Sequence, residues 1–372
     1  MEFTVSKADL VRELSLSQGV VERKTTIPIL SNVLFEVEGE RLSITATDLE
    51  LGIRCGAPAK VKSKGAGTIP AKKLLDYVRL LPEGDVTIKV GENHWANLTC
   101  GRTKTRIAGM SRESFPELPE RPEALTQLPI GLLASLISKT VFAISAEESR
   151  FTLNGALLLL RGEKVTMVAT DGHRLALAEM DNPLAVAELN YKALLPRKAM
   201  NELLKLSSDT SDRDAAVDFS GDDNHLFFGM GERLLISRKL TGNFPDFERV
   251  LPKSHTHAVE FNRDELRAAI ERVSQFSDER SRAIKVRFGD NEATLQSGTS
   301  ESGESEEPLS VEYGGPTVEI GFNAQYLLEY LRAVPEPKVA FHFKDSQSAG
   351  EMRSGGDAVS GQYRYVVMPM RI

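Results

Sequence analysis

The chain has 372 residues, 41% of them hydrophobic and 27% charged, a composition typical of a globular protein with two or three domains. It contains no run of about 18 apolar residues, so we expect no membrane-spanning helix. The formal net charge of −7 argues against a general nucleic-acid binder, unless basic residues gather on one face. The two cysteines have no metal-type spacing and the N-terminus has no signal-peptide pattern, so we expect a cytoplasmic protein without a disulfide framework.

The first 110 or so residues predict one pattern twice: a strand, a helix and three further strands. Period-two alternation of apolar and polar residues marks the strands, and an apolar stripe at helical spacing marks each helix. Ser6 is a suitable N-cap for the first helix, and Pro70 is tolerated at the start of the second. The three-strand stretches are predicted at 31–37, 41–47 and 51–55, and again at 86–90, 95–100 and 104–108.

The stretch Gly67–Leu81 resembles two later stretches of the chain. Similar stretches begin at Leu194 and Glu319, and a period of 126 residues places Pro70, Pro196 and Phe322 in register. A fixed long period indicates a repeated structural module. The sequence therefore predicts an α+β fold of three tandem domains, each made of two strand–helix–three-strand halves. The predicted domains are 1–120, 128–253 and 254–372.

Two helices per domain are enough to cover the apolar face of antiparallel sheets, so we expect the sheets outside and the helices together on one side. The proline-rich segment 115–122 reads as an inter-domain linker, and the Ser-, Gly- and Glu-rich segment 296–307 as a solvated loop. A series of repeated domains closes into a ring most simply as a head-to-tail homo-oligomer.

One short cluster could carry chemistry. Asp171, His173 and Arg174 lie within four positions and could supply an acid, a base and an anion binder to a hydrolase. The same place in the first domain, Ala46–Leu49, has the Thr-Asp pair but no histidine, and Asp-Gly after a strand is typical turn chemistry. No phosphate loop, zinc spacing or nucleophile elbow occurs elsewhere. We therefore expect no catalytic residue, metal or cofactor, and keep a hydrolase using Asp171 and His173 as the alternative.

Basic residues recur in register on the matched helices. They are Lys72, Lys73, Arg79, Arg197, Lys198 and Lys205, with Lys24 and Arg150 in loops. Helix faces lined with Lys and Arg can meet phosphates without reading base sequence, although any single lysine is as readily explained as a solvated residue. An acidic exterior with a basic lining would reconcile DNA binding with the net charge.

The C-terminal stretch Tyr365–Ile372 is too apolar for a frayed tail. Met368 and Met370 flank a proline, and methionine suits an adaptable hydrophobic surface that accepts several partners. A last core strand is the simpler interpretation, and Val366 and Val367 fit it.

Three motifs together resemble those of the bacterial DNA polymerase III β subunit family, and the resemblance covers the whole chain. They are Thr170–Leu175 (TDGHRL), Phe244–Pro252 (FPDFERVLP) and Tyr365–Arg371 (YVVMPMR). The resemblance implies a sliding clamp: a head-to-tail homodimeric ring that encircles double-stranded DNA, tethers the replicative DNA polymerase and has no enzymatic activity. It implies further partners, namely the clamp-loader ATPase that opens the ring, repair polymerases, ligase and mismatch-repair proteins. A monomeric adaptor that never encircles DNA is the remaining alternative.

The resemblance also assigns residues to sites. A partner-peptide pocket between the second and third domains would use Leu153, Thr170, Gly172, His173, Arg174, Leu175, Pro245, Arg249, Val250, Val366, Val367, Met368, Pro369, Met370 and Arg371. The DNA-facing positions would be Lys24, Lys72, Arg150, Phe151, Arg197 and Lys198. Candidates for the dimer interface are Lys104, Arg106 and Phe276.

Overall fold

Six copies of one pattern, a strand, a helix and three strands, follow one another in the computed structural model, which describes residues 1–21, 26–147, 149–186, 188–298, 303–355 and 362–371. The first domain contains β1 (Glu2–Ser6), α1 (Lys7–Gln18), β2 (Asn32–Glu38), β3 (Arg41–Thr47) and β4 (Leu51–Pro58), then β6 (Gly65–Pro70), α2 (Ala71–Leu80), β7 (Asp85–Val90), β8 (Trp95–Cys100) and β9 (Thr103–Ala108). A short strand that the sequence did not predict, β5 (Lys60–Ser63), lies between its two halves.

The second and third domains repeat the same order. The second has β10 (Thr126–Pro129), α3 (Ile130–Thr140), β11 (Gly155–Arg161), β12 (Lys164–Thr170), β13 (Arg174–Asp181), β14 (Asn190–Pro196), α4 (Arg197–Ser208), β15 (Ala216–Gly221), β16 (His225–Met230) and β17 (Arg233–Arg238). The third has β18 (His257–Asn262), α5 (Arg263–Val273), β19 (Ala283–Gly289), β20 (Glu292–Ser297), β21 (Glu306–Ser310), β22 (Val318–Asn323), α6 (Ala324–Ala333), β23 (Lys338–Phe343), β24 (Gly350–Ser354) and β25 (Gln362–Val367).

Local chemistry explains where the helices begin. The Ser6 hydroxyl accepts the Asp9 N–H at 3.1 Å and caps α1, as predicted. In the third domain the prediction is wrong by one residue. Asn323, and not Phe322, directly precedes α6, and its side chain accepts the Gln325 N–H at 2.9 Å. The start of α6 is therefore defined by an asparagine cap, whereas the start of α2 is defined by the fixed φ of Pro70.

The segment 296–307 is also more ordered at its ends than predicted, because β20 extends to Ser297 and β21 begins at Glu306. Both strands belong to one antiparallel hairpin in which Gln296 pairs with Glu306. Polar composition hid these strands, since one edge of the hairpin is exposed and needs no apolar alternation.

The two halves of each domain exchange their first strands. β1 pairs with β7 of the second half, whereas β6 pairs with β2 of the first half, and all these pairings are antiparallel. The same exchange joins β10 to β15, β14 to β11, β18 to β23 and β22 to β19. Each half therefore lacks one strand of its own sheet, and neither half can complete its sheet alone.

By its internal contacts the chain divides into two compact units. Unit 1 comprises residues 1–133, 184–186 and 198–239, and unit 2 comprises 134–183, 187–197 and 240–372. Unit 1 holds an eight-stranded sheet, β10-β15-β16-β17-β4-β3-β2-β6, and a smaller one, β5-β1-β7-β8-β9. Unit 2 holds the matching eight-stranded sheet β18-β23-β24-β25-β13-β12-β11-β14 and the smaller β21-β20-β19-β22. Each large sheet thus joins strands from two successive domains, at β17–β4 and at β25–β13.

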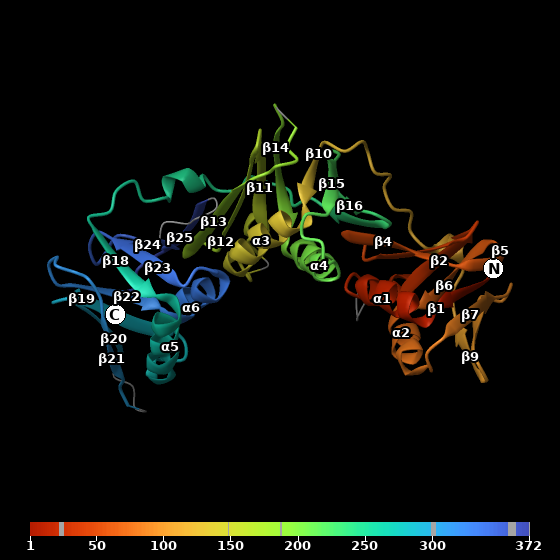
Figure 1. Ribbon diagram of the computed structural model, residues 1–372, viewed down its shortest axis with the longest axis horizontal. Coiled ribbons are helices and arrows are strands. Elements are labelled where there is room, and N and C mark those ends of the chain that lie inside the picture. Colours follow the sequence, from red (N-terminus) through yellow and green to blue (C-terminus); the bar gives the residue numbers. More distant parts are fainter. Residues whose placement is uncertain (22–25, 148, 187, 299–302, 356–361, 372) are drawn as a thin grey trace. The chain divides into compact units, whose positions relative to one another are not determined.

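Helices cover one face of the sheets in each unit (Figure 1). In unit 1, α1 packs against α2 and against β3 and β4; in unit 2, α5 packs against α6. The α2 stripe is buried as predicted, with Leu74, Leu75 and Val78 each 0% exposed. None of the helices in the described residues has the length and hydropathy that a membrane span requires.

Truncating Leu75 to alanine should therefore lower the free energy of unfolding by about 2–5 kcal/mol, because a fully buried leucine leaves a cavity. Lys73→Ala, two positions earlier on the exposed side of α2, should change it by less than about 0.5 kcal/mol. Urea unfolding followed by circular dichroism measures both, and equal effects would contradict the assigned stripe.

Candidate partner-binding and DNA-facing sites

The turn between β12 and β13 repeats the turn between β3 and β4. In each, an aspartate accepts two backbone N–H groups, and the preceding threonine hydroxyl donates to a carbonyl across the turn. For Asp171 the donors are His173 at 2.9 Å and Arg174 at 3.1 Å; for Asp48 they are Glu50 at 2.9 Å and Leu51 at 2.6 Å. The hydroxyl bonds join Thr170 to Arg174 and Thr47 to Leu51. Asp171 thus holds a turn by accepting from the backbone of His173, a residue that is itself exposed.

Arg174 faces the helices of unit 2 and is nearly buried, with 7% of the side chain exposed. It forms ion pairs with Asp171 and with Glu329 of α6, and donates to the Phe142 carbonyl at 2.7 Å. Its guanidinium also lies 4.3 Å from the ring centre of Tyr326. Burial alone would lower the pKa of Arg174, but interactions with Tyr365 and Glu329 outweigh burial and raise it. Arg174 therefore fixes the turn to α6.

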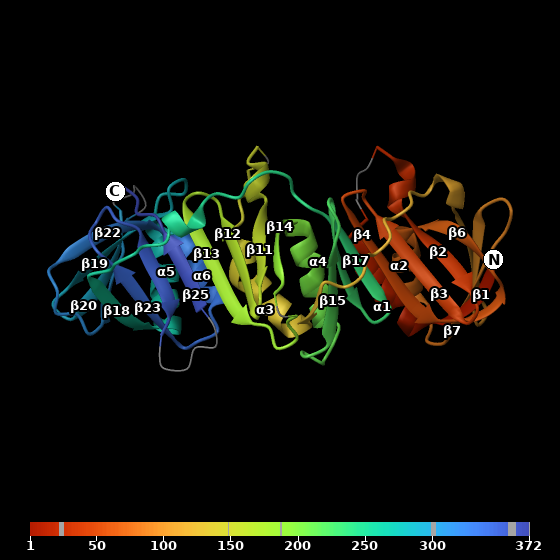
Figure 2. The same cartoon turned by 90° about the horizontal axis from the view of Figure 1, so that it is seen from above.

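An apolar cluster occupies the opposite face of the same sheet in unit 2. Its buried members are Leu157, Leu159, Val168, Leu175, Leu177, Leu194, Phe244 and Val366, and its partly buried members are Leu153, Leu240, Phe247, Leu251 and Ala349. The strands β11, β12, β13 and β25 that carry most of it lie side by side (Figure 2). Of the predicted pocket residues, the cluster includes Leu153, Leu175 and Val366. Arg174 and Val367, each adjacent to a cluster residue on its strand, point to the helix face because side chains alternate.

The segment between β17 and β18 forms one border of the apolar cluster. Phe244, Phe247 and Leu251 pack on it. The three predicted pocket residues of this segment, Pro245, Arg249 and Val250, are exposed, with 86% of the Arg249 side chain and 45% of Val250 accessible. Arg249 pairs with Asp246 at 2.8 Å. Apolar residues thus anchor the segment, and the predicted residues form its outer rim.

The tail forms a second border and is held by backbone bonds. The Met368 N–H donates to the His173 carbonyl at 2.9 Å, and the Met370 N–H donates to the Gly321 carbonyl at 2.8 Å. Met368 is 44% exposed, Pro369 and Met370 are partly buried, and Arg371 is exposed. The chain folds back in the same way after β17, where Leu240 donates to Leu194, and after β9, where Met110 bridges Thr68. The tail therefore occupies a position that the linkers occupy in the other domains.

Unit 2 thus brings together three stretches that are far apart in sequence: the turn containing Thr170, Gly172 and His173, the linker, and the tail. Most of the apolar residues between them, such as Leu157 and Phe244, are not among the predicted pocket residues. A signal was present, since Gly155–Arg161 is an almost uninterrupted apolar run, which is typical of a strand covered on both faces.

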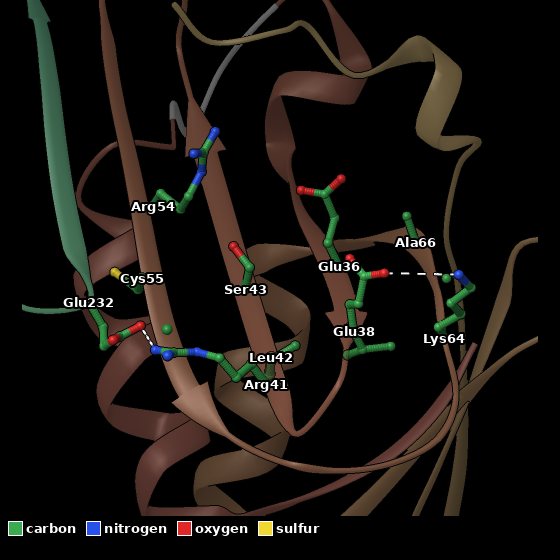
Figure 3. Close-up of a pocket in the computed structure, with 13 residues that line it drawn as sticks. Glu36, Glu38, Arg41, Leu42, Ser43, Arg54, Cys55, Lys64, Ala66 and Glu232 are labelled. Atoms are coloured by element: carbon green, nitrogen blue, oxygen red, sulfur yellow. Dashed lines mark ion pairs between the residues drawn. The ribbon is translucent and has the colours of Figure 1, made fainter. Parts of the chain in front are cut away.

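The matching face of unit 1 has a smaller apolar cluster, formed by Ile29, Leu30, Leu34 and Phe115, and a polar region next to it. Glu36, Ser43 and Arg54 stand there on β2, β3 and β4, around a hollow in which Arg41 pairs with Glu232 and Lys64 with Glu38 (Figure 3). Beside it, a side chain added at Gly52 would lie 2.9 Å from Leu118, so the first linker already fills that space. In the described part of the chain, the apolar cluster with a partly exposed border belongs to unit 2.

The predicted DNA-facing residues differ in exposure and in the number of contacts that they make within the chain. Lys24 lies outside the described residues. In unit 1, Lys72 pairs with Asp76 at 2.6 Å but keeps 70% of its side chain exposed, whereas Lys198 pairs with Asp48 and donates to Val20. In unit 2, Arg150 pairs with Glu147 at 2.8 Å and Phe151 is 71% exposed.

Arg197 is the predicted DNA-facing residue most engaged in structure. It donates to the carbonyls of Ile144 and Ser145. Burial, and then the nearby Arg174, lower its pKa. Arg197 thus connects the start of α4 to the residues that follow α3.

The dimer candidates lie at two sheet edges. Lys104 and Arg106 are exposed on β9, the last strand of the five-stranded sheet, and the Arg106 guanidinium lies 4.5 Å from the ring centre of Trp95. Phe276 is 38% exposed and lies beside Gly303, just before β21, the edge strand of the four-stranded sheet. Among the described residues, no group of three His, Cys, Asp or Glu side chains could hold a metal ion.

Comparisons with known proteins agree along the whole chain. Residues 1–119, 127–246 and 248–371 match the N-terminal, central and C-terminal domain models of the DNA polymerase III beta subunit. The chain is 36% identical to the beta sliding clamp of Pseudomonas putida, covering 100% of both proteins. The crystal structure of the DNA polymerase III subunit beta from Pseudomonas aeruginosa is similar with a TM-score of 0.93 at 35% identity, covering 100% of both chains. That of the Bacillus subtilis sliding clamp gives 0.94 at 26%, covering 100% of this chain and 99% of that one.

Replacing Arg174 with methionine should lower the free energy of unfolding by about 3 kcal/mol, because it leaves the Asp171 and Glu329 carboxylates without their shared cation. Arg249→Met, at an exposed ion pair, should cost less than about 0.5 kcal/mol. Urea unfolding measures both, and a cost at Arg174 no larger than at Arg249 would show that the buried pairs do not hold the turn.

Proposed function

The chain belongs to the bacterial DNA polymerase III β subunit family, the DNA sliding clamps of replication, and we propose that two copies close head to tail around duplex DNA and hold partner proteins on the apolar cluster of unit 2. A junction here is an antiparallel pair formed by the last strand of a second half and the last strand of a first half. The observation that carries this proposal is that each chain contains two complete junctions, β17–β4 and β25–β13, and two edge strands, β9 and β21, that could form a third with another copy. We retain 1–120, 128–253 and 254–372 as its predicted domains.

The two junctions within the chain share one register. At β17–β4, Ser237 lies opposite Leu51 and Ile236 opposite Gly52. At β25–β13, Val367 lies opposite Arg174 and Val366 opposite Leu175. Adding 130 to the residue numbers of β17 and 123 to those of β4 gives the paired residues of β25 and β13. In both, the last strand of a second half pairs with the last strand of a first half.

Among the described strands, β9 and β21 are the last strands of halves that pair on one side only. β9 has the place of β17 and β25 in its domain, and β21 has the place of β4 and β13. The shared register would set Thr105 opposite Ser305 of a second copy, Arg106 opposite its Glu304, and Lys104 opposite its Glu306. Opposite charges that face each other across an antiparallel pair contribute about 0.2–1 kcal/mol each. Phe276, next to Gly303, would lie at the end of this junction.

A closed ring holds DNA by topology, so it needs few strong contacts and tolerates a net charge of −7. The exposed Lys72 and Phe151, and the partly buried Arg150, support contacts with phosphates and bases that do not depend on sequence. Asp171 serves a turn and His173 lies at its exposed tip, which supports a non-catalytic role. A protein working on the bacterial chromosome would act in the cytoplasm.

The apolar cluster supports the proposed contacts with partners. Its floor is apolar, and its borders are two segments that expose Val250 and Met368, which suits an extended peptide with hydrophobic anchors. The replicative polymerase subunit and the clamp-loader ATPase would bind there, as would repair polymerases, ligase and mismatch-repair proteins. Sharing one surface makes such partners compete.

A chain ending at Val367 should bind a fluorescent polymerase-type clamp-binding peptide about 30- to 1,000-fold more weakly than the full chain in an anisotropy titration, because it lacks the border formed by Met368 and Met370. Val250→Asp should weaken binding as well, whereas Val186→Asp, at a similarly exposed valine in unit 1, should not. If the full chain does not bind the peptide, the proposed role of the apolar cluster is wrong.

The proposed ring can be tested by charge reversal. Lys104→Glu with Arg106→Glu should convert a dimer of about twice 40.9 kDa into a monomer in light scattering at moderate salt, because like charges would face each other. Adding Glu304→Arg and Glu306→Lys to the same chain should restore the dimer. Lys60→Glu, on the other edge strand of the same sheet, should leave it intact. Failure of the compensating changes would contradict the register, and a monomeric wild-type chain would contradict the ring.

A further inference from the structure

Beside the apolar cluster, unit 2 buries a carboxylate that no site described above uses. Glu351 on β24 is 0% exposed and accepts hydrogen bonds from Arg353, Arg364 and His255. The distances are 2.9 and 3.1 Å from Arg353, 2.5 and 3.1 Å from Arg364, and 2.6 Å from His255 Nε2. Burial alone would raise the pKa of Glu351, but the hydrogen bonds from Arg364, Arg353 and His255 outweigh it and lower the pKa to about 2. The carboxylate is therefore charged at neutral pH.

Stability alone is a poor reason for such a cluster. Removing charges from water costs several kcal/mol per ion, and well-packed apolar residues often serve as well. Buried polar groups that are fully satisfied do, however, fix one arrangement of the segments that carry them. Glu351, Arg353, Arg364 and His255 form what we name the Glu351 cluster.

The Glu351 cluster lies against the apolar floor. Glu351 is directly opposite Val366 on β25, and Arg364 is directly opposite Leu177 on β13. Both Val366 and Leu177 belong to the apolar cluster. The residues of the Glu351 cluster and those of the apolar cluster thus lie on one continuous face of the eight-stranded sheet.

The same cluster holds the end of the linker. His255 bonds to Glu351, and Arg364 donates to the Pro252 carbonyl at 3.3 Å. The linker is therefore attached at two places, by Phe244, Phe247 and Leu251 on the apolar cluster and by Pro252 and His255 on the Glu351 cluster. The exposed rim of Pro245, Arg249 and Val250 belongs to this doubly attached segment.

We propose that Glu351 is a positioning residue for partner binding. Its ion cluster holds the carboxyl end of the linker and so fixes the position of Pro245, Arg249 and Val250 relative to the apolar cluster. It would thereby control peptide affinity without touching the peptide. The inference rests on the proposed function, because the position of the rim matters to a partner only if a peptide docks there.

The test compares peptide affinity with linker motion in the full-length chain. Glu351→Gln removes the charge that binds three donors. His255→Ala removes one of the two contacts from the linker, leaving Glu351 with both arginines and Arg364 with the Pro252 carbonyl. Each should weaken binding of the polymerase-type peptide by roughly tenfold and should speed amide hydrogen exchange in 244–257 but not in β11, β12 or β13. His255→Gln, which keeps a donor, should restore much of the affinity. Glu260→Gln, at an exposed carboxylate of the same unit, is the matched control.

Wild-type affinity in both variants, with unchanged exchange in the linker, would overturn the proposal. So would faster exchange throughout the sheet, since Glu351 would then serve global stability. If the wild-type chain fails to bind the peptide while His255→Ala still releases the linker alone, the proposed function fails and the attachment itself stands.

Discussion

Each half of a domain ends in a strand that needs a partner, and this need for edge pairing determines much of the rest of the structure. An unpaired edge exposes a row of backbone donors and acceptors that other strands can use. Four of the six terminal strands meet this need within the chain, at β17–β4 and β25–β13. Those two junctions share one register, and the proposed ring extends that register to the edge strands β9 and β21 as two matching parts of a third junction.

The same backbone arrangement carries different chemistry at each junction. Where unit 2 has Leu175 and Leu177, unit 1 has Gly52 and Arg54, and the first linker covers Gly52 with Leu118. At the free edge the same register assigns Glu304 and Glu306. The repeat therefore supplies geometry, and side-chain identity decides whether a junction is closed by its linker, offers an apolar floor, or presents charge to a second copy. The proposed partner-binding surface therefore belongs to unit 2, where the described residues of this junction are apolar.

Local patterns made the repeated helices and most strands predictable. The α2 stripe, the Ser6 cap and the strands of the first domain follow from spacing and capping chemistry that act within a few residues. The exchange of first strands between halves did not follow, since pairing of β1 with β7 involves residues far apart in sequence. Two side chains illustrate the same limit at the sites. Lys198 looked like a free cation on a helix but pairs with Asp48, and Arg174 looked like a pocket residue but faces the helices with Glu329. Only the tertiary arrangement reveals those partners.

The most direct test of the shared junction is a disulfide across the proposed third copy of it. With Thr105→Cys and Ser305→Cys in one chain, the register places the two sulfur atoms opposite each other in neighbouring copies, within reach of a normal disulfide. Mild oxidation should then give a covalently closed dimer in non-reducing electrophoresis. Thr105→Cys with Glu307→Cys, displaced by two residues or about 7 Å along the strand, should not. Equal cross-linking of both pairs, or efficient cross-linking of the displaced pair alone, would contradict the account.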